Sequence, residues 1–151
     1  MPVWTPQEAA RQLLSVLPPL NRLMITELRQ EADDDMTMPQ FRVLTYLAEK
    51  PVTLSAIARL RRVSLQAAGE LVQSLVERGW IERVPDPNDR RQSMLHLTEQ
   101  GWAKYRQLDD RMRQRLLIYM EKLSEAEMAA VQLALPALQR VIMEGNEDVG
   151  D

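Results

Sequence analysis

The sequence predicts a mainly helical protein that carries one small β-hairpin. Four short motifs place a hydroxyl side chain before a stretch in which apolar residues recur at three- and four-residue steps, which is typical of capped amphipathic helices. These hydroxyls belong to Thr5, Thr37, Ser64 and Ser124. Residues 80–84 and 93–97 alternate between apolar and polar side chains and flank a loop rich in Pro, Asn and Asp, a pattern that indicates a hairpin.

Breaks in the helical pattern set the ends of the expected helices. Proline cannot donate the helical hydrogen bond, so Pro18-Pro19 is expected to bend the first helix and Pro136 to kink the last. One helix stops ahead of Pro51 because the residue before proline avoids the helical region, and Gly79 is a natural C-terminal cap for another. The expected helices cover residues 6–32, 38–49, 54–61, 65–78, 99–123 and 125–144.

The order of these elements divides the chain into three parts. Residues 37–98 combine three helices, a tight turn before the third and a two-stranded hairpin, which is the arrangement of a winged helix-turn-helix lobe. Residues 1–36 supply an N-terminal helix and linker, and residues 99–151 supply two C-terminal helices with a frayed acidic tail. The fold class is therefore mainly α with a small β-wing, a winged helix-turn-helix lobe between flanking helices.

The composition argues against an enzyme. The chain has no cysteine, one histidine and five glycines, which removes thiol nucleophiles, glycine-rich phosphate loops and histidine-based acid–base pairs. Adjacent carboxylates such as Asp109 and Asp110 diverge on a helix instead of converging on a substrate. We therefore expect no enzymatic activity and no cofactor.

Neither a membrane nor a metal is an expected partner. The N-terminus lacks the basic and apolar segments of an export signal, and the uncharged run 128–139 is too short to cross a bilayer. A soluble cytoplasmic protein is the expectation. The acidic run 33–35 with Glu31 can hold a hard cation, although such loops are more often solvated. His96 lacks the companions of a zinc site and is expected to be structural.

The charge pattern leaves room for a local nucleic-acid site. The net charge of -3, from 19 basic and 22 acidic residues, excludes a uniformly basic surface. Residues 55–91, however, contain seven arginines and five acidic residues, which gives this stretch a net charge of +2. A mildly basic lobe in an acidic chain is compatible with DNA binding.

Several stretches of the central lobe occur together in a known family. Residues 37–44 read TMPQFRVL, residues 54–58 read LSAIA and residues 71–83 read LVQSLVERGWIER. The most specific stretch is the wing, residues 86–101, which reads DPNDRRQSMLHLTEQG. Together they resemble the multiple antibiotic resistance regulator (MarR) family, densely over residues 37–101 and, in the length and order of helices, beyond them.

The resemblance implies a homodimeric transcriptional regulator of a bacterium or archaeon. It implies that the first and the last two helices dimerise and that two winged lobes grip a pseudo-palindromic double-stranded DNA site. It also implies that a small effector, often aromatic or phenolic, can release the DNA. The position of an effector pocket in this chain, and whether an effector exists, stay unassigned.

The helix over residues 65–78 has one apolar and one polar face. The apolar face is expected to pack on the core and consists of Ala68, Leu71, Val72, Leu75 and Val76. The polar face consists of Gln66, Gly69, Glu70, Gln73 and Glu77.

The polar face has the chemistry of a surface that reads DNA. Its glutamines can make paired contacts with adenine edges, and Glu70 can accept from a cytosine amino group. Small residues near the helix start let the backbone approach a groove, and the capping hydroxyl suits a phosphate. The alternative is a solvated surface, which Glu70 favours because many family members carry a basic residue there. The expected DNA contacts are Ser64, Gln66, Ala67, Gly69, Glu70 and Gln73.

The wing tip carries Asp89, Arg90 and Arg91. Asp89 can pair with the Arg91 side chain and direct it outward, and an arginine at a hairpin tip suits a narrow minor groove. The resemblance implies that Arg91 is the minor-groove residue and Asp89 its orienting partner. The alternative is an ordinary charged loop.

The C-terminal helices carry apolar residues at helical spacing. A long apolar seam needs a partner, either a second copy of the chain or the first helix of the same chain, and the resemblance favours the dimer. Methionines at positions 24, 112, 120 and 128 can line an adaptable pocket or simply fill the core. The expected dimerisation residues are Leu108, Met112, Leu116, Tyr119, Leu135 and Leu138.

The sequence therefore predicts a dimeric DNA-binding transcriptional regulator, with repression favoured over activation. The rival hypothesis is a winged-helix protein-interaction module that does not bind DNA, motivated by Glu70 and by a net charge of -3. The retained Asp89, Arg90 and Arg91 distinguish the two hypotheses, because a protein-binding lobe has no need of them.

Overall fold

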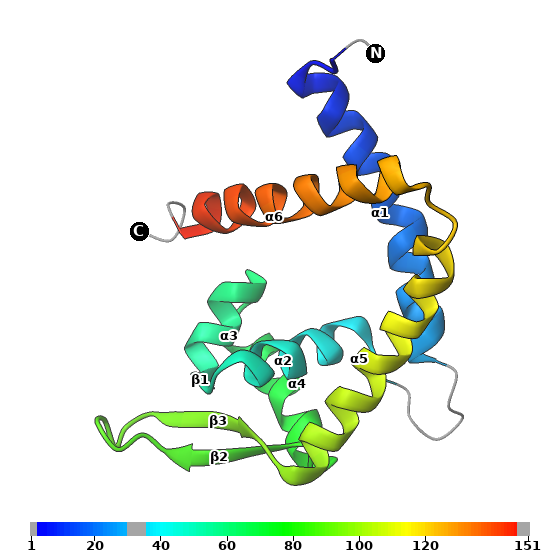
Figure 1. The fold of residues 1–151 in the computed structure, drawn as a ribbon. Coiled ribbons are helices and arrows are strands. Elements are labelled where there is room, and N and C mark those ends of the chain that lie inside the picture. Colours follow the sequence, from blue (N-terminus) through cyan, green and yellow to red (C-terminus); the bar gives the residue numbers. More distant parts are fainter. Residues whose placement is uncertain (1–2, 30–35, 148–151) are drawn as a thin grey trace. The chain divides into compact units, whose positions relative to one another are not determined.

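The computed structural model describes residues 3–29 and 36–147 (Figure 1). It is mainly helical with one small antiparallel sheet, as the sequence predicts. It divides into two compact units, Met1–Met112 and Arg113–Asp151. The elements are α1 (Pro6–Leu28), α2 (Met38–Glu49), β1 (Val52–Thr53), α3 (Leu54–Arg61), α4 (Leu65–Glu77), β2 (Ile81–Pro85), β3 (Ser93–Leu97), α5 (Glu99–Met120) and α6 (Glu125–Glu147).

Reciprocal capping hydrogen bonds start the helices where the sequence places them. At α2 the Thr37 hydroxyl accepts from the Gln40 amide at 3.3 Å, and the Gln40 side-chain oxygen accepts from the Thr37 amide at 2.9 Å. The same reciprocal pair joins Ser124 and Glu127 at the start of α6. These bonds satisfy amides that have no partner inside the helix, so the starts are confirmed.

Some helix ends differ from the expectation. Helix α1 ends at Leu28, and the expected end at residue 32 lies outside the described residues. Pro18 and Pro19 lie inside α1 without ending it. Helix α5 ends at Met120, three residues early, whereas α6 continues to Glu147 through what was expected to be the start of a frayed tail. The signals at these ends are weak, because several residue types continue a helix equally well.

The wing is a three-stranded sheet, and the expectation of two strands was incomplete. The order is β1-β3-β2, with all pairs antiparallel. Strands β2 and β3 form the predicted hairpin, in which Ile81 pairs with Leu97 and Pro85 with Ser93. The missed strand β1 places Val52 opposite Leu95. Two residues are too few to show an alternating pattern, so this strand could not be predicted from the sequence.

The core lies inside the first unit and fixes the orientation of α4. The predicted apolar face of α4 is confirmed, since Ala68, Val72 and Leu75 are fully buried and the other two residues are partly buried. Helix α1 contributes Leu28 to the same core and α5 contributes Leu108. The largest fully buried side chains are Leu28, Leu44, Ile57, Leu75, Ile81, Leu95, Leu108, Val43 and Val72.

A close backbone approach ties the base of the wing to α5. Gly79 adopts a left-handed φ of 75°, which ends α4 as predicted. The Thr98 amide donates to the Trp80 carbonyl at 3.1 Å, and the Thr98 hydroxyl donates to the Gly79 carbonyl. A β-carbon at Gly101 would overlap the Trp80 carbonyl oxygen, so only glycine fits there. The wing therefore has a fixed base.

Candidate nucleic-acid interface

Helices α3 and α4 are joined by the tight turn of a helix-turn-helix. Arg62 adopts a left-handed φ of 52°, and the amide of Val63 donates to the Ala58 carbonyl at 3.0 Å, which closes the end of α3. The Ser64 hydroxyl then caps α4 by accepting from the Ala67 amide at 3.1 Å. Since α4 also buries its apolar face, its polar face is held outward.

The polar face of α4 is open along its length. Gln66, Glu70, Gln73 and Glu77 are exposed, as is Ala67 near the helix start. A β-carbon at Gly69 would come no closer than 3.9 Å to Leu54, an ordinary contact, so packing does not require glycine at this position. The predicted contact residues Ser64, Gln66, Ala67, Glu70 and Gln73 are thus exposed on one element, with Gly69 partly buried beside them.

Two side-chain hydrogen bonds organise this face in a way that the sequence analysis missed. The Gln66 side-chain amide donates to a Glu70 carboxylate oxygen at 3.2 Å. The Gln73 side-chain amide donates to a Glu77 carboxylate oxygen at 3.3 Å. The four-residue spacing of each pair was visible in the sequence and could have predicted them. Helix α4 contains no Lys or Arg, so its exposed face is anionic.

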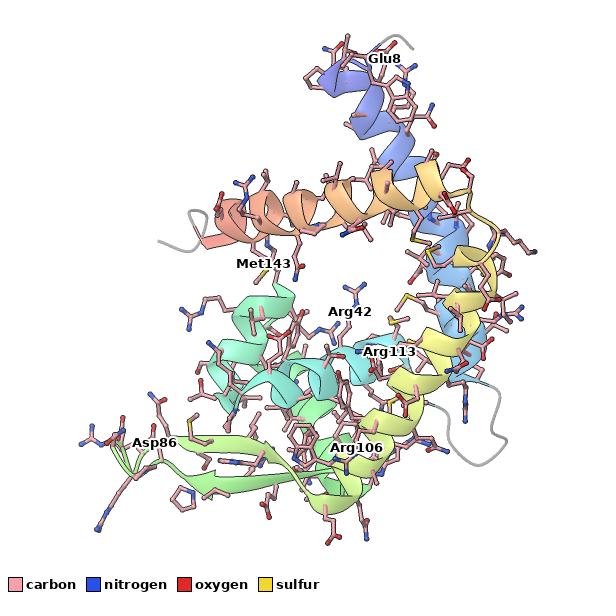
Figure 2. All side chains as sticks on the ribbon, viewed as in Figure 1. Glu8, Arg42, Asp86, Arg106, Arg113 and Met143 are labelled. Atoms are coloured by element: carbon pink, nitrogen blue, oxygen red, sulfur yellow. The ribbon has the colours of Figure 1, made fainter. Side chains whose placement is uncertain are left out.

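Hydrogen bonds within the loop shape the wing tip. The Asp86 carboxylate accepts from the Asn88 amide at 2.8 Å, and the Asp89 carboxylate accepts from the Arg91 amide at 3.0 Å. The Asp86 amide also donates to the Gln92 carbonyl at 3.0 Å, which closes the loop. Asp86 lies in the loop at the outer end of the hairpin (Figure 2). These Asx turns give the loop a defined shape.

The Asp89 carboxylate contacts the backbone of Arg91, whereas the sequence predicted a pairing with its side chain. The carboxylate is held by the Arg91 amide, and within the described residues no ion pair joins it to the Arg91 guanidinium. Arg90 and Arg91 are both exposed. The arginine side chains are therefore available for an external anion such as a phosphate or a minor-groove edge.

A cleft of about 270 Å³ connects the wing with the start of α4. Arg91, Gln92 and Arg83 line it from the wing, and Ser55 and Leu65 line it from the helix-turn-helix. Arg83 was not among the expected contacts, although its position on a strand next to the tip could have indicated it. The cleft brings two arginines next to the helix whose polar face is exposed.

Comparison with known proteins identifies the family. The sequence profile described as the MarR family matches residues 34–92. The multiple antibiotic resistance protein MarR of Salmonella typhimurium is 33% identical over 103 residues, which cover 67% of this chain and 72% of that protein. The chain belongs to the MarR family. It is therefore a transcriptional regulator with a DNA-binding winged helix.

Solved structures of MarR-family architecture agree over nearly the whole chain. The crystal structure of RV1404 from Mycobacterium tuberculosis matches with a TM-score of 0.80 and 28% identity, covering 93% of this chain and 95% of that one. The crystal structure of Streptococcus pneumoniae FabT in complex with DNA matches with a TM-score of 0.72 and 26% identity, covering 91% and 97%. The predicted fold class is confirmed.

The expected dimerisation residues of this MarR-family chain fall into three groups by their exposure. Leu108 and Met112 are 2% and 6% exposed because they pack into the core of their own unit, so they offer no surface to a partner. This corrects their assignment. Leu116 is partly buried, and the remaining three are exposed. Those three exposed residues are Tyr119, Leu135 and Leu138.

The start of α5 packs against its own chain. This agrees in part with the alternative that the same chain covers the apolar seam. Trp102 and Tyr105 contact the core, and the Tyr105 ring stacks on that of Phe41 with centroids 6.2 Å apart. Arg111 donates to the Glu27 carbonyl of α1 at 3.1 Å. The apolar side chains of α5 up to Met112 are therefore packed within their own unit.

A second hollow, of about 590 Å³, lies between the end of α1 and the start of α2. Its lining includes Met36 and Met38 but none of the four methionines for which the sequence left a pocket or the core open. Met112 instead belongs to the core. The lining residues are Ile25, Leu28, Arg29, Met36, Thr37, Met38 and Pro39.

The remaining expectations concern metals and membranes. His96 is partly buried on β3 opposite Glu82, and within the described residues no group of three or more ligating side chains gathers around a metal position. The acidic run 33–35 lies outside the described residues. In the part of the chain that the structure covers, no helix is long and apolar enough to cross a bilayer.

Proposed function

We propose that the chain is a homodimeric repressor that acts in the cytoplasm by binding a pseudo-palindromic promoter site. The observation that carries the proposal is the cleft that Arg91 and Arg83 share with Leu65, at the start of α4. It supports a mode of binding in which α4 enters the major groove and the wing reaches the adjacent minor groove. Occupation of the promoter by two lobes excludes the polymerase.

Exposed apolar side chains support the homodimer. Helix α6 leaves Leu133 78% and Leu135 59% exposed, and α1 leaves Leu14 65% exposed. On α6 the exposed Leu135, Leu138 and Ile142 recur at three- and four-residue steps, and such a stripe is typical of an interface that a second chain covers. In the first unit the residues proposed to contact a second chain are Leu13, Leu14, Val16 and Leu17 of α1, and in the second unit they are Leu117, Ile118 and Tyr119 of α5 and Leu135, Leu138 and Ile142 of α6.

The hollow between α1 and α2 is the proposed site for a small effector. Its lining combines apolar side chains with Arg29, a composition that suits an aromatic acid or phenol. Binding there would act on the first turn of α2, where Gln40 joins the helix cap to the Ser74 hydroxyl of α4 at 3.1 Å. An effector that moved this turn would therefore move the reading helix and release the DNA.

A binding selection on genomic fragments tests the proposal. The full chain is incubated with sheared genomic DNA at two salt concentrations, and the retained fragments are sequenced. We expect enrichment of an inverted repeat whose half-sites are centred about one helical turn apart, roughly 34 Å. Absence of enrichment at the lower salt concentration would contradict the proposed function.

The second candidate is a winged-helix module that binds a protein. The anionic face of α4, with Glu70 and Glu77 exposed and no basic residue on the helix, is the observation that favours it. The two candidates differ in their need for the wing arginines. If the chain passes through DNA and heparin resins unretained at low salt, the protein-binding module is favoured.

A further inference from the structure

The exposed face of α4 carries two identical side-chain pairs. Gln66 donates to Glu70 at 3.2 Å and Gln73 donates to Glu77 at 3.3 Å, and all four side chains are exposed. Exposed pairs four residues apart add little to helix stability. They do, however, fix the direction in which each glutamine amide points, because a carboxylate accepts hydrogen bonds and cannot donate them.

The bond to Glu70 leaves Gln66 with the groups that an adenine edge requires. The amide nitrogen of Gln66 carries two hydrogens, of which the carboxylate takes one. One N–H and the side-chain oxygen then stay available on the same amide plane. Adenine presents an acceptor at N7 and a donor at its amino group, which is the complementary pair.

The carboxylate of Glu70 has the chemistry to discriminate between bases. Its second oxygen can accept from the amino group of cytosine, whereas guanine and thymine present only acceptor atoms to the major groove, apart from the thymine methyl group. No Lys or Arg on α4 offsets the anion. The guanine contact that arginine or lysine usually makes is therefore missing from this helix, and the carboxylate repels the guanine edge.

We propose that Gln66 and Glu70 act as one unit that reads exocyclic amino groups, with Glu70 accepting from a cytosine and Gln66 contacting an adenine in each half-site. The inference rests on the proposed DNA-binding function and adds a base preference to it. Attraction to the phosphates then comes mainly from the wing, where Arg83 and Arg91 line the cleft.

The pair Gln73–Glu77 supplies a matched control in the same helix. It has the same residue types, spacing and hydrogen bond, but it lies seven residues later, about 10 Å further along the helix axis. In helix-turn-helix proteins the N-terminal part of the reading helix contacts the bases. Neutralising Glu77 therefore changes the charge of the helix without changing the unit that reads bases.

A selection from a randomised DNA library with the wild-type chain, Glu70→Gln and Glu77→Gln tests the inference. We expect Glu70→Gln to lose about tenfold discrimination for cytosine at one position of each half-site and to keep its other preferences. Glu77→Gln is expected to keep every preference and to bind all sequences more tightly. Equal melting temperatures of the three proteins show that the fold is retained.

The outcomes separate this inference from the proposed function. If the wild-type chain selects no motif, the DNA-binding function itself fails. If it selects a motif and Glu70→Gln selects the same motif with the same discrimination, the function stands and the paired unit is wrong. An equal loss of discrimination in Glu77→Gln would also overturn it, because the effect would then follow charge alone.

Modified DNA gives an independent readout. N4-methylation of the selected cytosine preserves its pairing with guanine but replaces the amino hydrogen that faces the major groove. We expect the modified site to bind the wild-type chain about tenfold more weakly and to bind Glu70→Gln with little change. An equal effect on both proteins, or no effect on either, would contradict a contact between Glu70 and the cytosine amino group.

Discussion

The winged lobe and helix α6 place their apolar side chains in opposite environments. In the lobe, Leu44, Leu75 and Leu95 are each at most 1% exposed, whereas in α6 Leu133 is 78% and Leu135 59% exposed. Both regions have helices that begin with reciprocal caps. The difference therefore concerns packing and not local helix formation. It shows that the lobe buries its apolar side chains within one chain, whereas α6 leaves its own exposed, as the proposed dimer requires.

The largest expected effect comes from shortening one leucine in each region. Leu75→Ala leaves a cavity in the lobe, and we expect it to lower the free energy of unfolding by about 3 kcal/mol at every protein concentration. Leu135→Ala is expected to lower the melting temperature only in dilute protein, because it weakens association. Calorimetry across a hundredfold range of concentration checks both. If the melting temperature of Leu135→Ala does not depend on protein concentration, the proposal that a second chain covers α6 is contradicted.

A pair of glycines gives the next largest effect. A β-carbon at Gly101 would overlap the Trp80 carbonyl oxygen, so Gly101→Ala is expected to destabilise the chain by about 2 kcal/mol. Gly145 in α6 has nothing within 4 Å of such a β-carbon. Gly145→Ala should then stabilise the helix by about 0.5–1 kcal/mol. Urea denaturation measures both, and similar losses in the two variants would contradict the assigned packing.

Removing one arginine from the wing should weaken DNA binding by about tenfold and reduce the salt dependence by about one counterion. The variant is Arg91→Ala, whose side chain lines the cleft beside α4. Arg140→Ala is the matched control, because Arg140 lies on α6 and pairs with Glu144 at 3.8 Å. Fluorescence anisotropy at several salt concentrations provides the measurement. Unchanged binding of Arg91→Ala would show that the wing does not contact DNA.

The smallest expected effect concerns the caps. The Ser124 amide, and then its hydroxyl, hydrogen-bond the carboxylate of Glu127 and lower its pKa below 4.5. Because the pKa is lowered in the folded state, the ionised Glu127 carboxylate stabilises the folded protein above pH 4.5. This contribution is lost as the pH falls through the lowered pKa. In α2 the corresponding partner is Gln40, which does not titrate.

Acid titration followed by NMR checks this contrast. We expect the Ser124 amide resonance to shift below pH 4.5 while the Thr37 amide stays constant. Glu127→Gln should abolish the shift and keep the cap. A shift of equal size at both amides would indicate a general acid transition instead of the titration of one carboxylate.

The sequence predicts local features well where one side chain decides them. A hydroxyl followed three residues later by Glu or Gln starts a helix, and Gly79 ends one, because these interactions lie within one turn. The short strand β1 depends instead on β3, more than 40 residues away, so its own two residues carry no signal. Interactions within one helical turn can be predicted from the sequence, whereas the pairing of strands far apart in the chain cannot.

The candidate site follows the same division. Exposure of Gln66, Glu70 and Gln73 follows from the period of the α4 apolar face. The place of Arg83 beside Arg91 depends on the register of the wing, and the burial of Leu108 depends on contacts with other elements. Apolar periodicity identifies a helix face that will be covered, but it does not say whether the cover comes from the same chain.

The central claim, that two copies of the lobe bind one DNA site, is tested most directly by hydroxyl-radical footprinting of the full chain on a selected operator. The account predicts two protected regions related by two-fold symmetry and centred about one helical turn apart, both lost together when the chain is diluted below its dimerisation range. A single protected region, or two regions that disappear at different protein concentrations, would contradict it.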